Sequence, residues 1–432
     1  SGPAQLNSKS VPLRPVAKRL AFLWILERTL STLKIDDLAI FGGQPRFDDP
    51  AHVGRPAVGS IELILKRIRE SLENRSLTNN GPFVQEFERR ICKATRTKHA
   101  IAVANATVGL QLAIRALGMK GAVIVPSFTF VATAQALHWQ GIKPVFCDVD
   151  PQTHCIDIND VEQKMSADIS GIIGVHLWGS ACNVDGLSDI ASRHNVPLLL
   201  DAAQAFGVKR DGLPIGGNGA AEVFSFHATK FVNSFEGGAI TTNDLEFANQ
   251  LRLMRNFGFE DYDEVVQSGT NAKMCEPAAA MGITSIESAE RFLAINRENL
   301  FKYREGLQSI QGIMFHDRLL DEGSNCHYAV VELNEHEFGL SRDQLLKILW
   351  AENIIARKYF WPGCHRIPVF CNDNPSSLPV TEALCNRVLQ LPTGSGMAVS
   401  QVAMVCDLLQ TIAMHSDEIR SRMEQNGVAQ SP

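Results

Sequence analysis

Residues 100–126 read AIAVANATVGLQLAIRALGMKGAVIVP, and their alternating character determines the expected fold class. The stretch begins and ends with short apolar runs, over residues 100–104 and 122–126, which are typical of buried strands. Between them, residues 107–118 (TVGLQLAIRALG) show the spacing of a helix. A strand, a helix and a second strand predict a crossover unit whose two strands run parallel.

The same rhythm continues as far as residue 242. Helical patterns recur over residues 130–141 and 184–195. Further apolar, strand-like runs cover residues 144–149, 171–177, 197–201, 222–226 and 238–242. This alternation predicts an α/β protein with a mainly parallel sheet, in which ligands bind at the carboxyl ends of the strands.

The C-terminal part of the chain has a different pattern. Residues 325–333 indicate a strand, residues 342–360 a helix and then another strand, and residues 400–415 a late helix. We therefore predict a smaller α+β domain after the α/β domain. The expected division is an N-terminal extension over residues 1–43, a large domain over residues 44–290 and a small domain over residues 291–432.

Composition excludes several classes of function. The formal net charge is −6, from 41 basic and 47 acidic residues without a long basic run, which argues against a nucleic-acid partner. No apolar stretch reaches 18 residues, which argues against a membrane span. Ten scattered cysteines without a C-x-x-C pair predict reduced thiols and a cytoplasmic location. Cys364 beside His365 could suggest a metal ligand or a nucleophile, but no second ligand pair stands nearby, so we expect no metal site.

The N-terminal region carries a basic, partly apolar segment over residues 11–30. We favour an amphipathic helix that packs on the body of the protein or on a partner subunit. A removed targeting peptide is the alternative, but no small-residue cleavage site follows the segment.

Polar residues follow several of the predicted strands. Asn105 and Thr107 open the first helix, where they could cap it or where its N-terminus could bind phosphate. Phe130 could be a core residue or could lie flat on a planar cofactor. Asp201 ends a fully apolar strand, where a carboxylate needs a partner. Two roles are open for it: a cap of the next turn, or the partner of a cationic ring nitrogen.

Lys230 stands between the predicted strand over residues 222–226 and a glycine pair, Gly237 and Gly238. If the strands that precede Asp201 and Lys230 are neighbours, the carboxylate and the amine share one rim of the sheet. A lysine that bonds to an aldehyde, with an aspartate that keeps a pyridine protonated, is the minimal arrangement for pyridoxal phosphate. We expect the glycines to form a turn without side chains that could block the cofactor.

Six motifs show a resemblance to a known family. They are NATVGL (105–110), VPSFTFVAT (125–133), DAAQAFG (201–207), FSFHATKFVNSFEGG (224–238), GTNAKM (269–274) and YFWPGCH (359–365). The chain resembles the DegT/StrS family of pyridoxal-phosphate sugar aminotransferases, of fold type I, from about residue 54 to residue 396. It is most similar to the nucleotide-sugar C4 aminotransferases of the desosamine type, which serve deoxyaminosugar and antibiotic biosynthesis.

The resemblance implies a role for each matching residue. Lys230 is expected to bind the cofactor covalently, and Asp201 to pair with the pyridinium nitrogen. The remaining expected cofactor contacts are Gln204 near the ring oxygen, Phe130 stacked on the ring, and Ser225 with the backbone of Ala106 and Thr107 at the phosphate. Asn271 is expected to reach the cofactor phosphate of a neighbouring subunit, which implies a homodimer with shared active sites.

The implied reaction moves the amino group of L-glutamate to C4 of dTDP-4-keto-6-deoxy-D-glucose. Three alternatives stay open: amination of a 3-keto or other nucleotide sugar, dehydration by a related enzyme, and a non-catalytic regulatory protein. The related dehydratases have a histidine at the anchoring position, so Lys230 argues against dehydration. The intact set of Lys230, Asp201 and Ser225 argues against a regulatory protein.

Overall fold

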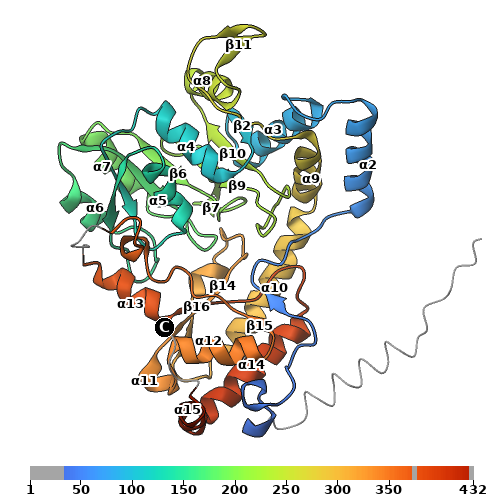
Figure 1. The fold of residues 1–432 in the computed structure, drawn as a ribbon, viewed down its shortest axis with the longest axis vertical. Coiled ribbons are helices and arrows are strands. Elements are labelled where there is room, and N and C mark those ends of the chain that lie inside the picture. Colours follow the sequence, from blue (N-terminus) through green and yellow to red (C-terminus); the bar gives the residue numbers. More distant parts are fainter. Residues whose placement is uncertain (1–33, 372–376, 428–432) are drawn as a thin grey trace, which may run out of the picture.

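The computed structural model of the protein describes residues 34–371 and 377–427. Its centre is a seven-stranded sheet with the order β2-β10-β9-β6-β5-β3-β4. The strands are β2 (His99–Val103), β3 (Ala122–Pro126), β4 (Lys143–Cys147), β5 (Ile169–Val175), β6 (Leu198–Asp201), β9 (Ala221–Ser225) and β10 (Gly238–Thr242). All neighbours pair in parallel except β10, which is antiparallel to both β2 and β9. The predicted α/β class with a mainly parallel sheet is confirmed (Figure 1).

Helices cover both faces of this sheet. One apolar cluster joins strand residues such as Ile101 and Val125 to α4 (Ala106–Ala116), α5 (Val131–His138) and α8 (Leu245–Arg255). On the other face lie α3 (Pro82–Thr95), α7 (Val184–Arg193) and α9 (Glu276–Glu287), with α6 (Ile158–Lys164) beside α7. Strands covered on both faces need apolar side chains in every position, which explains the uninterrupted apolar runs in the sequence.

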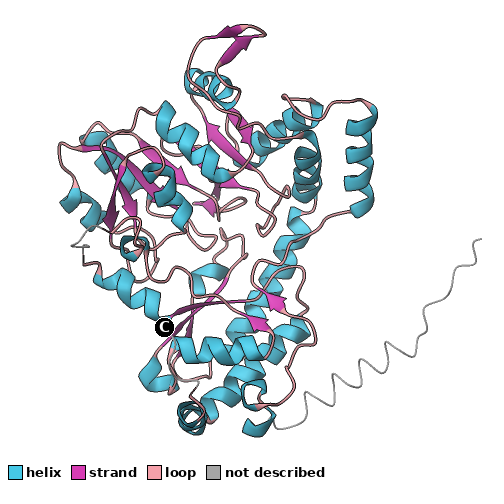
Figure 2. Cartoon of the chain, in the orientation of Figure 1, coloured by secondary structure: helices cyan, strands magenta, loops and turns pink. Residues whose placement is uncertain are grey.

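A second, smaller layer follows the long helix α10 (Ala289–Leu307). Its antiparallel sheet has the order β13-β14-β16, formed by β13 (Ile313–Phe315), β14 (Ala329–Leu333) and β16 (Val388–Leu391). The helices around it are α11 (Glu335–Phe338), α12 (Arg342–Ala351), α13 (Pro379–Arg387), α14 (Val399–Met414) and α15 (Ser416–Gln425). Figure 2 shows this layer below the large sheet, with α10 running between the two.

The first described residues pack on the smaller layer. Strand β1 (Ala51–His52) pairs in parallel with β15 (Ile354–Ile355). The Glu352 carboxylate accepts hydrogen bonds from the backbone N–H groups of Ala39 and Arg46. The described residues on both sides of the predicted boundary at residue 43 therefore contact the C-terminal half of the chain. The division into three parts remains a prediction. The predicted helix over residues 11–30 lies outside the described residues.

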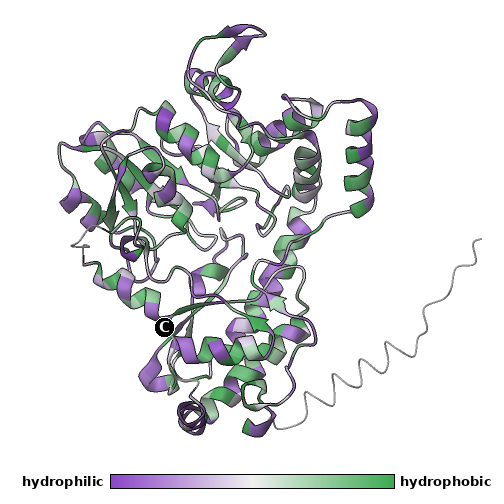
Figure 3. Cartoon of the chain, viewed as in Figure 1, coloured by the Kyte–Doolittle hydropathy of each residue, from purple (hydrophilic) through white to green (hydrophobic). Residues whose placement is uncertain are grey.

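Two features stand out at the edge of the molecule. Helix α2 (Ile61–Glu73) lies beside α9 and leaves Ile61, Leu65 and Leu72 exposed (Figures 1 and 3). A hairpin of β11 (Phe259–Asp261) and β12 (Glu264–Val265) projects beyond α8. The remaining short elements are the hairpin β7 (Lys209–Arg210) with β8 (Leu213–Pro214) and the 3-10 helices η1 (Ile35–Asp37), η2 (Ala39–Phe41), η3 (Asp317–Leu320) and η4 (Cys364–Arg366).

Candidate active site

A cavity of about 710 Å³ opens at the carboxyl ends of the large sheet. Asp201 is the last residue of β6, Ser225 is the last residue of β9, and α4 starts directly after β2. Strands β6 and β9 are neighbours, as the sequence analysis required. Seven of the eight predicted site residues line the cavity: Ala106, Thr107, Phe130, Asp201, Gln204, Ser225 and Lys230.

The Asp201 carboxylate is almost completely buried and is held by two hydrogen bonds. Thr133 donates to one oxygen over 2.7 Å, and the backbone N–H of Ala203 donates to the other over 3.0 Å. Burial raises the pKa of Asp201, while these hydrogen bonds and the nearby Lys230 amine oppose the rise. The second bond is the turn cap that the sequence allowed, so Asp201 caps the turn and also faces the cavity.

Lys230 lies on the loop between β9 and β10. Its amine is 3.5 Å from the hydroxyl of Tyr328. Burial lowers the pKa of Lys230 to about 8, although the Asp201 carboxylate acts in the opposite direction. A lysine with this pKa has a far larger fraction of neutral, nucleophilic amine near neutral pH than an ordinary lysine has.

The start of α4 provides an anion-binding corner. The Asn105 side chain accepts a hydrogen bond from the N–H of Val108, so Asn105 is the cap of this helix. The N–H groups in the first turn of a helix have no intrahelical partner and carry the positive end of the dipole. Ala106 and Thr107 bring this turn to the cavity, and Ser225 adds a hydroxyl from the end of β9.

The glycine pair after Lys230 has a different function from the expected one. Gly238 is the first residue of β10, not part of a turn, and neither Gly237 nor Gly238 lines the cavity. A Cβ on Gly238 would lie 2.7 Å from the backbone nitrogen of Ala106. A Cβ on Gly237 would lie 2.1 Å from the Ser234 hydroxyl. Gly238 therefore lets β10 pack directly against the start of α4, whereas Gly237 fits against Ser234 and Met274. The prediction that the pair forms a turn at the cofactor site is wrong.

Phe130 and Gln204 form two further parts of the wall. The Phe130 side chain is 50% exposed and meets the ring of Tyr359 edge-on at 6.4 Å between centroids, so it is not a core residue. The Gln204 side-chain oxygen accepts a hydrogen bond from the backbone N–H of Trp178. This bond fixes the amide beside the cavity.

Asn271 does not join the other seven predicted residues in this subunit. It is exposed, pairs with Asn256 through an isolated β-bridge, and does not line the cavity. Its expected action on a neighbouring subunit stays a prediction.

Several lining residues come from the smaller layer and were not predicted. They are His327, Tyr328, Tyr359, Phe360 and Gln390. Tyr359 and Phe360 lie within one of the six motifs, YFWPGCH, but had no assigned role. Tyr328 and Gln390 lie on or beside strands β14 and β16, and only the three-dimensional fold brings them near Lys230.

These residues fit pyridoxal phosphate. The cavity combines a buried carboxylate, a lysine whose pKa is lowered, an aromatic ring at the mouth and a helix N-terminus with a hydroxyl. They correspond to the ring nitrogen, the aldehyde, the ring face and the phosphate of that cofactor.

A buried cluster outside the cavity could suggest a metal site. The ligand atoms of His154, His316 and Glu332 lie within 4.8 Å of one another. However, Trp178 donates its indole N–H to Nδ1 of His154, so Nε2 carries the proton of the neutral ring and donates to Glu332 over 3.0 Å. Burial lowers the pKa of His316 to about 4. The cluster is a hydrogen-bonded network beside Trp178, without a free lone pair on His154.

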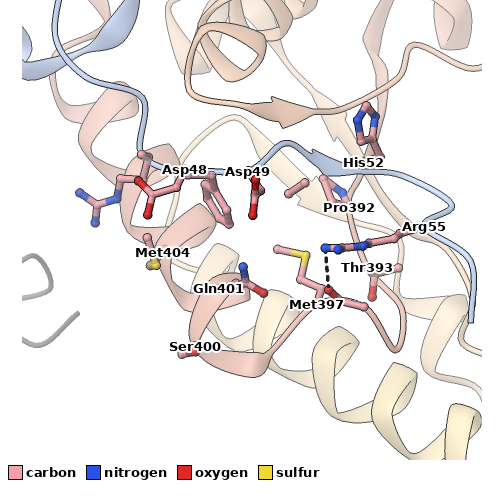
Figure 4. Close-up of a pocket in the computed structure, with 14 residues that line it drawn as sticks. Asp48, Asp49, His52, Arg55, Pro392, Thr393, Met397, Ser400, Gln401 and Met404 are labelled. Atoms are coloured by element: carbon pink, nitrogen blue, oxygen red, sulfur yellow. Dashed lines mark hydrogen bonds between the residues drawn. The ribbon is translucent and has the colours of Figure 1, made fainter. Parts of the chain in front are cut away.

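A second cavity, of about 240 Å³, lies between the N-terminal segment and α14. Figure 4 shows Asp48, Asp49 and Arg55 on one side and Gln401 on the helix opposite. The Arg55 guanidinium donates to the carbonyl oxygen of Gly396 over 3.4 Å. None of the predicted site residues lines this cavity.

Among the helices of the described ranges, none is both long enough and apolar enough to span a membrane.

Comparisons with known proteins agree with this geometry. A profile of the DegT/DnrJ/EryC1/StrS aminotransferase family matches residues 60–410. The dTDP-4-amino-4,6-dideoxy-D-glucose transaminase of Shigella dysenteriae is 36% identical over 346 residues, which are 80% of this chain and 94% of the relative. GDP-perosamine synthase of Caulobacter vibrioides is 32% identical over 354 residues, 80% of this chain and 94% of that protein. The structure of DesI, determined in the presence of its TDP-sugar product, matches with a TM-score of 0.87 and 43% sequence identity. The match covers 90% of this chain and 100% of the DesI chain.

Proposed function

Because the chain belongs to the DegT/DnrJ/EryC1/StrS aminotransferase family, we propose that it transfers the amino group of L-glutamate to C4 of dTDP-4-keto-6-deoxy-D-glucose. The products are dTDP-4-amino-4,6-dideoxy-D-glucose and 2-oxoglutarate, and the cofactor is pyridoxal phosphate. The family resemblance and fold type inferred from the sequence are confirmed. Two relatives that bear the name of this transaminase support the substrate, as does the DesI structure with its TDP-sugar product.

One observation carries the proposal. A single cavity contains the buried Asp201 carboxylate, the Lys230 amine with a pKa of about 8 and the first turn of α4. When bound, pyridoxal phosphate carries the amino group and withdraws electrons from the carbon that loses its proton. Every other step depends on groups of this chain.

Lys230 has two tasks in this mechanism. Its amine holds the cofactor before the reaction and, once released by the amino donor, accepts the proton from the donor's Cα and delivers it onward. Burial favours both tasks because it keeps a fraction of the amine neutral. The Asp201 carboxylate keeps the ring nitrogen protonated, and Thr133 with the Ala203 N–H holds that carboxylate in place.

Tyr328 positions the Lys230 amine. Its hydroxyl lies 3.5 Å from Nζ, and burial raises its pKa, so the hydroxyl stays protonated. Edge-on contact with the Trp178 ring, at 5.7 Å between centroids, holds the phenol ring. The hydroxyl oxygen can therefore accept a hydrogen bond from the amine.

We further propose a homodimer with shared active sites. Asn271 is exposed, lies outside its own subunit's cavity and follows the projecting β11–β12 hairpin, as a residue that reaches a partner would. The exposed Ile61, Leu65 and Leu72 of α2 give an apolar surface of the kind that subunit interfaces cover. All ten cysteines are unpaired, which supports a reducing compartment such as the cytoplasm.

A second candidate acceptor is a GDP-linked 4-keto sugar, since GDP-perosamine synthases are also among the relatives. The decisive experiment offers the purified holoenzyme L-glutamate with the dTDP-linked 4-keto sugar, its 3-keto isomer or the GDP-linked 4-keto sugar, and assigns each product by NMR. We expect efficient amination of the dTDP-linked 4-keto sugar, with an equatorial amine at C4. Preference for the 3-keto or the GDP-linked sugar would contradict the proposed substrate, and elimination of a hydroxyl would contradict the proposed reaction.

A further inference from the structure

The cavity has too few cations for the proposed amino donor, and this inference rests on the proposed function. L-Glutamate brings two carboxylates. The lysine and acidic side chains that line the cavity are Lys230, Asp201 and Glu236. His176 also lines it: burial lowers the pKa of this ring, but Cys182 and Glu222 raise it to about 10. The charge of His176 is matched by the buried Glu222 carboxylate 3.3 Å away, so it is not free for a ligand. Lys230 is engaged by the cofactor, and burial lowers the pKa of the lining His327 to about 4, so that ring is neutral. A carboxylate needs a hydrogen-bonded cation when it leaves water, and the wall must supply one.

Gln390 offers an unused polar group at this wall. It lies on β16, is 4% exposed and lines the cavity. Its side-chain oxygen has no hydrogen-bond partner among the described residues. A buried amide without a partner is costly, and at a ligand cavity it indicates a ligand that completes it. A half-turn of the amide presents its NH₂ group in place of the oxygen, so Gln390 can donate to an anion.

Arg357 is fixed beside Gln390. The two residues exchange backbone hydrogen bonds of 3.0 and 2.8 Å, so they are direct neighbours across an antiparallel bridge. The Arg357 guanidinium carbon lies 5.0 Å from the ring centroid of Tyr359, which itself lines the cavity. Arg357 is exposed, and it forms none of the ion pairs of the described chain. Arg357 itself does not line the cavity, but its guanidinium is held beside the wall by stacking on a ring that does, and it keeps its donors available.

We propose that Arg357 and Gln390 bind a carboxylate of the amino donor. The planar fork of the guanidinium matches a carboxylate, and the Gln390 amide adds a third donor from the adjacent strand. Arg357 lies on the smaller layer, whereas Lys230 and Asp201 lie on the larger one. Bound L-glutamate would therefore contact both layers. The same donors would also suit the diphosphate of the nucleotide sugar, and the experiment separates these two sources of anionic oxygen.

The test uses the holoenzyme and three variants. Arg357→Gln removes the cation. Gln390→Glu keeps nearly the same shape and adds a negative charge that repels a carboxylate. Arg304→Gln is the matched control, because Arg304 is also exposed and stacked 5.0 Å over a ring, that of Phe301 on α10. Circular dichroism and the yellow colour of the bound cofactor confirm that each variant is folded and loaded.

The first measurement is binding of glutarate, which has both carboxylates of glutamate and no amino group, by calorimetry. The second is the concentration of L-glutamate that gives half-maximal bleaching of the cofactor colour in a single half-reaction. The third is the same half-saturation value for the dTDP-linked 4-keto sugar in the opposite half-reaction. For Arg357→Gln and Gln390→Glu we expect glutarate binding to weaken, and the half-saturating concentration of L-glutamate to rise, roughly 10- to 100-fold. The half-saturating concentration of the nucleotide sugar should not change in these variants. In the Arg304→Gln control, all three values should stay as in the unmodified enzyme.

Unchanged binding of glutarate in both site variants would overturn the proposal. A defect confined to the nucleotide sugar would also overturn it and would assign the two residues to the diphosphate. Failure of the proposed function looks different: the unmodified enzyme would then neither bleach with L-glutamate nor aminate the sugar. Glutarate binding decides the role of Arg357 and Gln390 even in that case.

Discussion

At Lys230, two opposing influences set the pKa of the side-chain amine. Removal from water favours the neutral form, and the Asp201 carboxylate favours the charged form. Desolvation is the stronger influence, and the pKa falls from the usual 10.5 to about 8. The site thus holds an amine that is partly neutral at neutral pH, next to a carboxylate whose own pKa is raised by burial.

The first prediction concerns the pH dependence of cofactor attachment to Lys230. Only the neutral amine attacks an aldehyde, so the rate at which cofactor-free protein turns yellow should rise with pH and level off above a pH of about 8. Stopped-flow absorbance at several pH values measures this rate. A rate that still rises steeply above about pH 10 would show an ordinary, solvated lysine.

The second prediction concerns Asp201→Asn. The amide cannot supply the charge that keeps the ring nitrogen protonated, so turnover should fall by at least about 10- to 100-fold, the usual worth of a charge-assisted hydrogen bond. Because Asp201 raises the pKa of Lys230, that pKa should also fall below its present value. Steady-state kinetics and the pH profile of colour formation check the two effects. Near-normal turnover would reduce Asp201 to its role as a cap of the turn at Ala203.

At the level of elements, the contact between β10 and α4 sets the geometry of the anion-binding corner. Gly238 is the first residue of β10 and lies directly against the backbone of Asn105 and Ala106. The position of the first turn of α4 therefore depends on a strand that lies more than a hundred residues later in the sequence, and no local pattern could reveal that dependence.

The third prediction tests this contact through Gly238→Ala. The new methyl group would lie 2.7 Å from backbone atoms of Asn105 and Ala106, which cannot move aside as a flexible side chain could. We expect a loss of about 1–3 kcal/mol in stability from overpacking, together with weaker cofactor binding because the start of α4 is displaced. Urea unfolding and cofactor titration measure both. Unchanged stability and unchanged cofactor affinity would mean that β10 and α4 can move apart without a loss of free energy.

The sequence predicted the elements of the large sheet well, because most of its seven strands are almost fully buried and are therefore mainly apolar runs; the edge strand β4 begins with the exposed Lys143. The strand before Asp201 and the strand before Lys230 were expected to be neighbours and are. By contrast, β16 (Val388–Leu391) was not expected, since its existence depends on long-range pairing with β14. Gln390 was missed with it, whereas Tyr328 lies within the predicted strand over residues 325–333 but had no assigned role.

At the level of the whole molecule, the position of Asn271 distinguishes a monomeric site from a shared one. Seven of the eight predicted site residues meet in one cavity, and Asn271 alone is exposed outside it. The sequence motifs contain all eight residues in one chain, so they do not show to which subunit's active site each residue contributes. The geometry requires a partner for Asn271 if it contacts a cofactor at all.

The fourth prediction is therefore a complementation experiment. Lys230→Ala and Asn271→Ala should each lose most activity alone. In a mixed dimer, one site would carry both defects and the other would be intact, so activity should return to about a quarter of the unmodified level after random exchange of equal amounts. Activity assays before and after subunit exchange, with mixed dimers verified by mass spectrometry, check this. No recovery in verified mixed dimers would contradict a shared site.

The pairing of β14 with β16 has a consequence for how the protein is made. A growing chain contains all seven strands of the large sheet once residue 242 has left the ribosome, and with them Lys230 and Asp201. The wall that carries Gln390 can form only after residues 388–391 emerge and pair with β14. During that interval Lys230 belongs to an unfinished pocket and is not yet buried by the residues that lower its pKa. Productive capture of the vitamin-derived cofactor is thus a late event in biosynthesis, completed only when nearly the entire polypeptide has been translated.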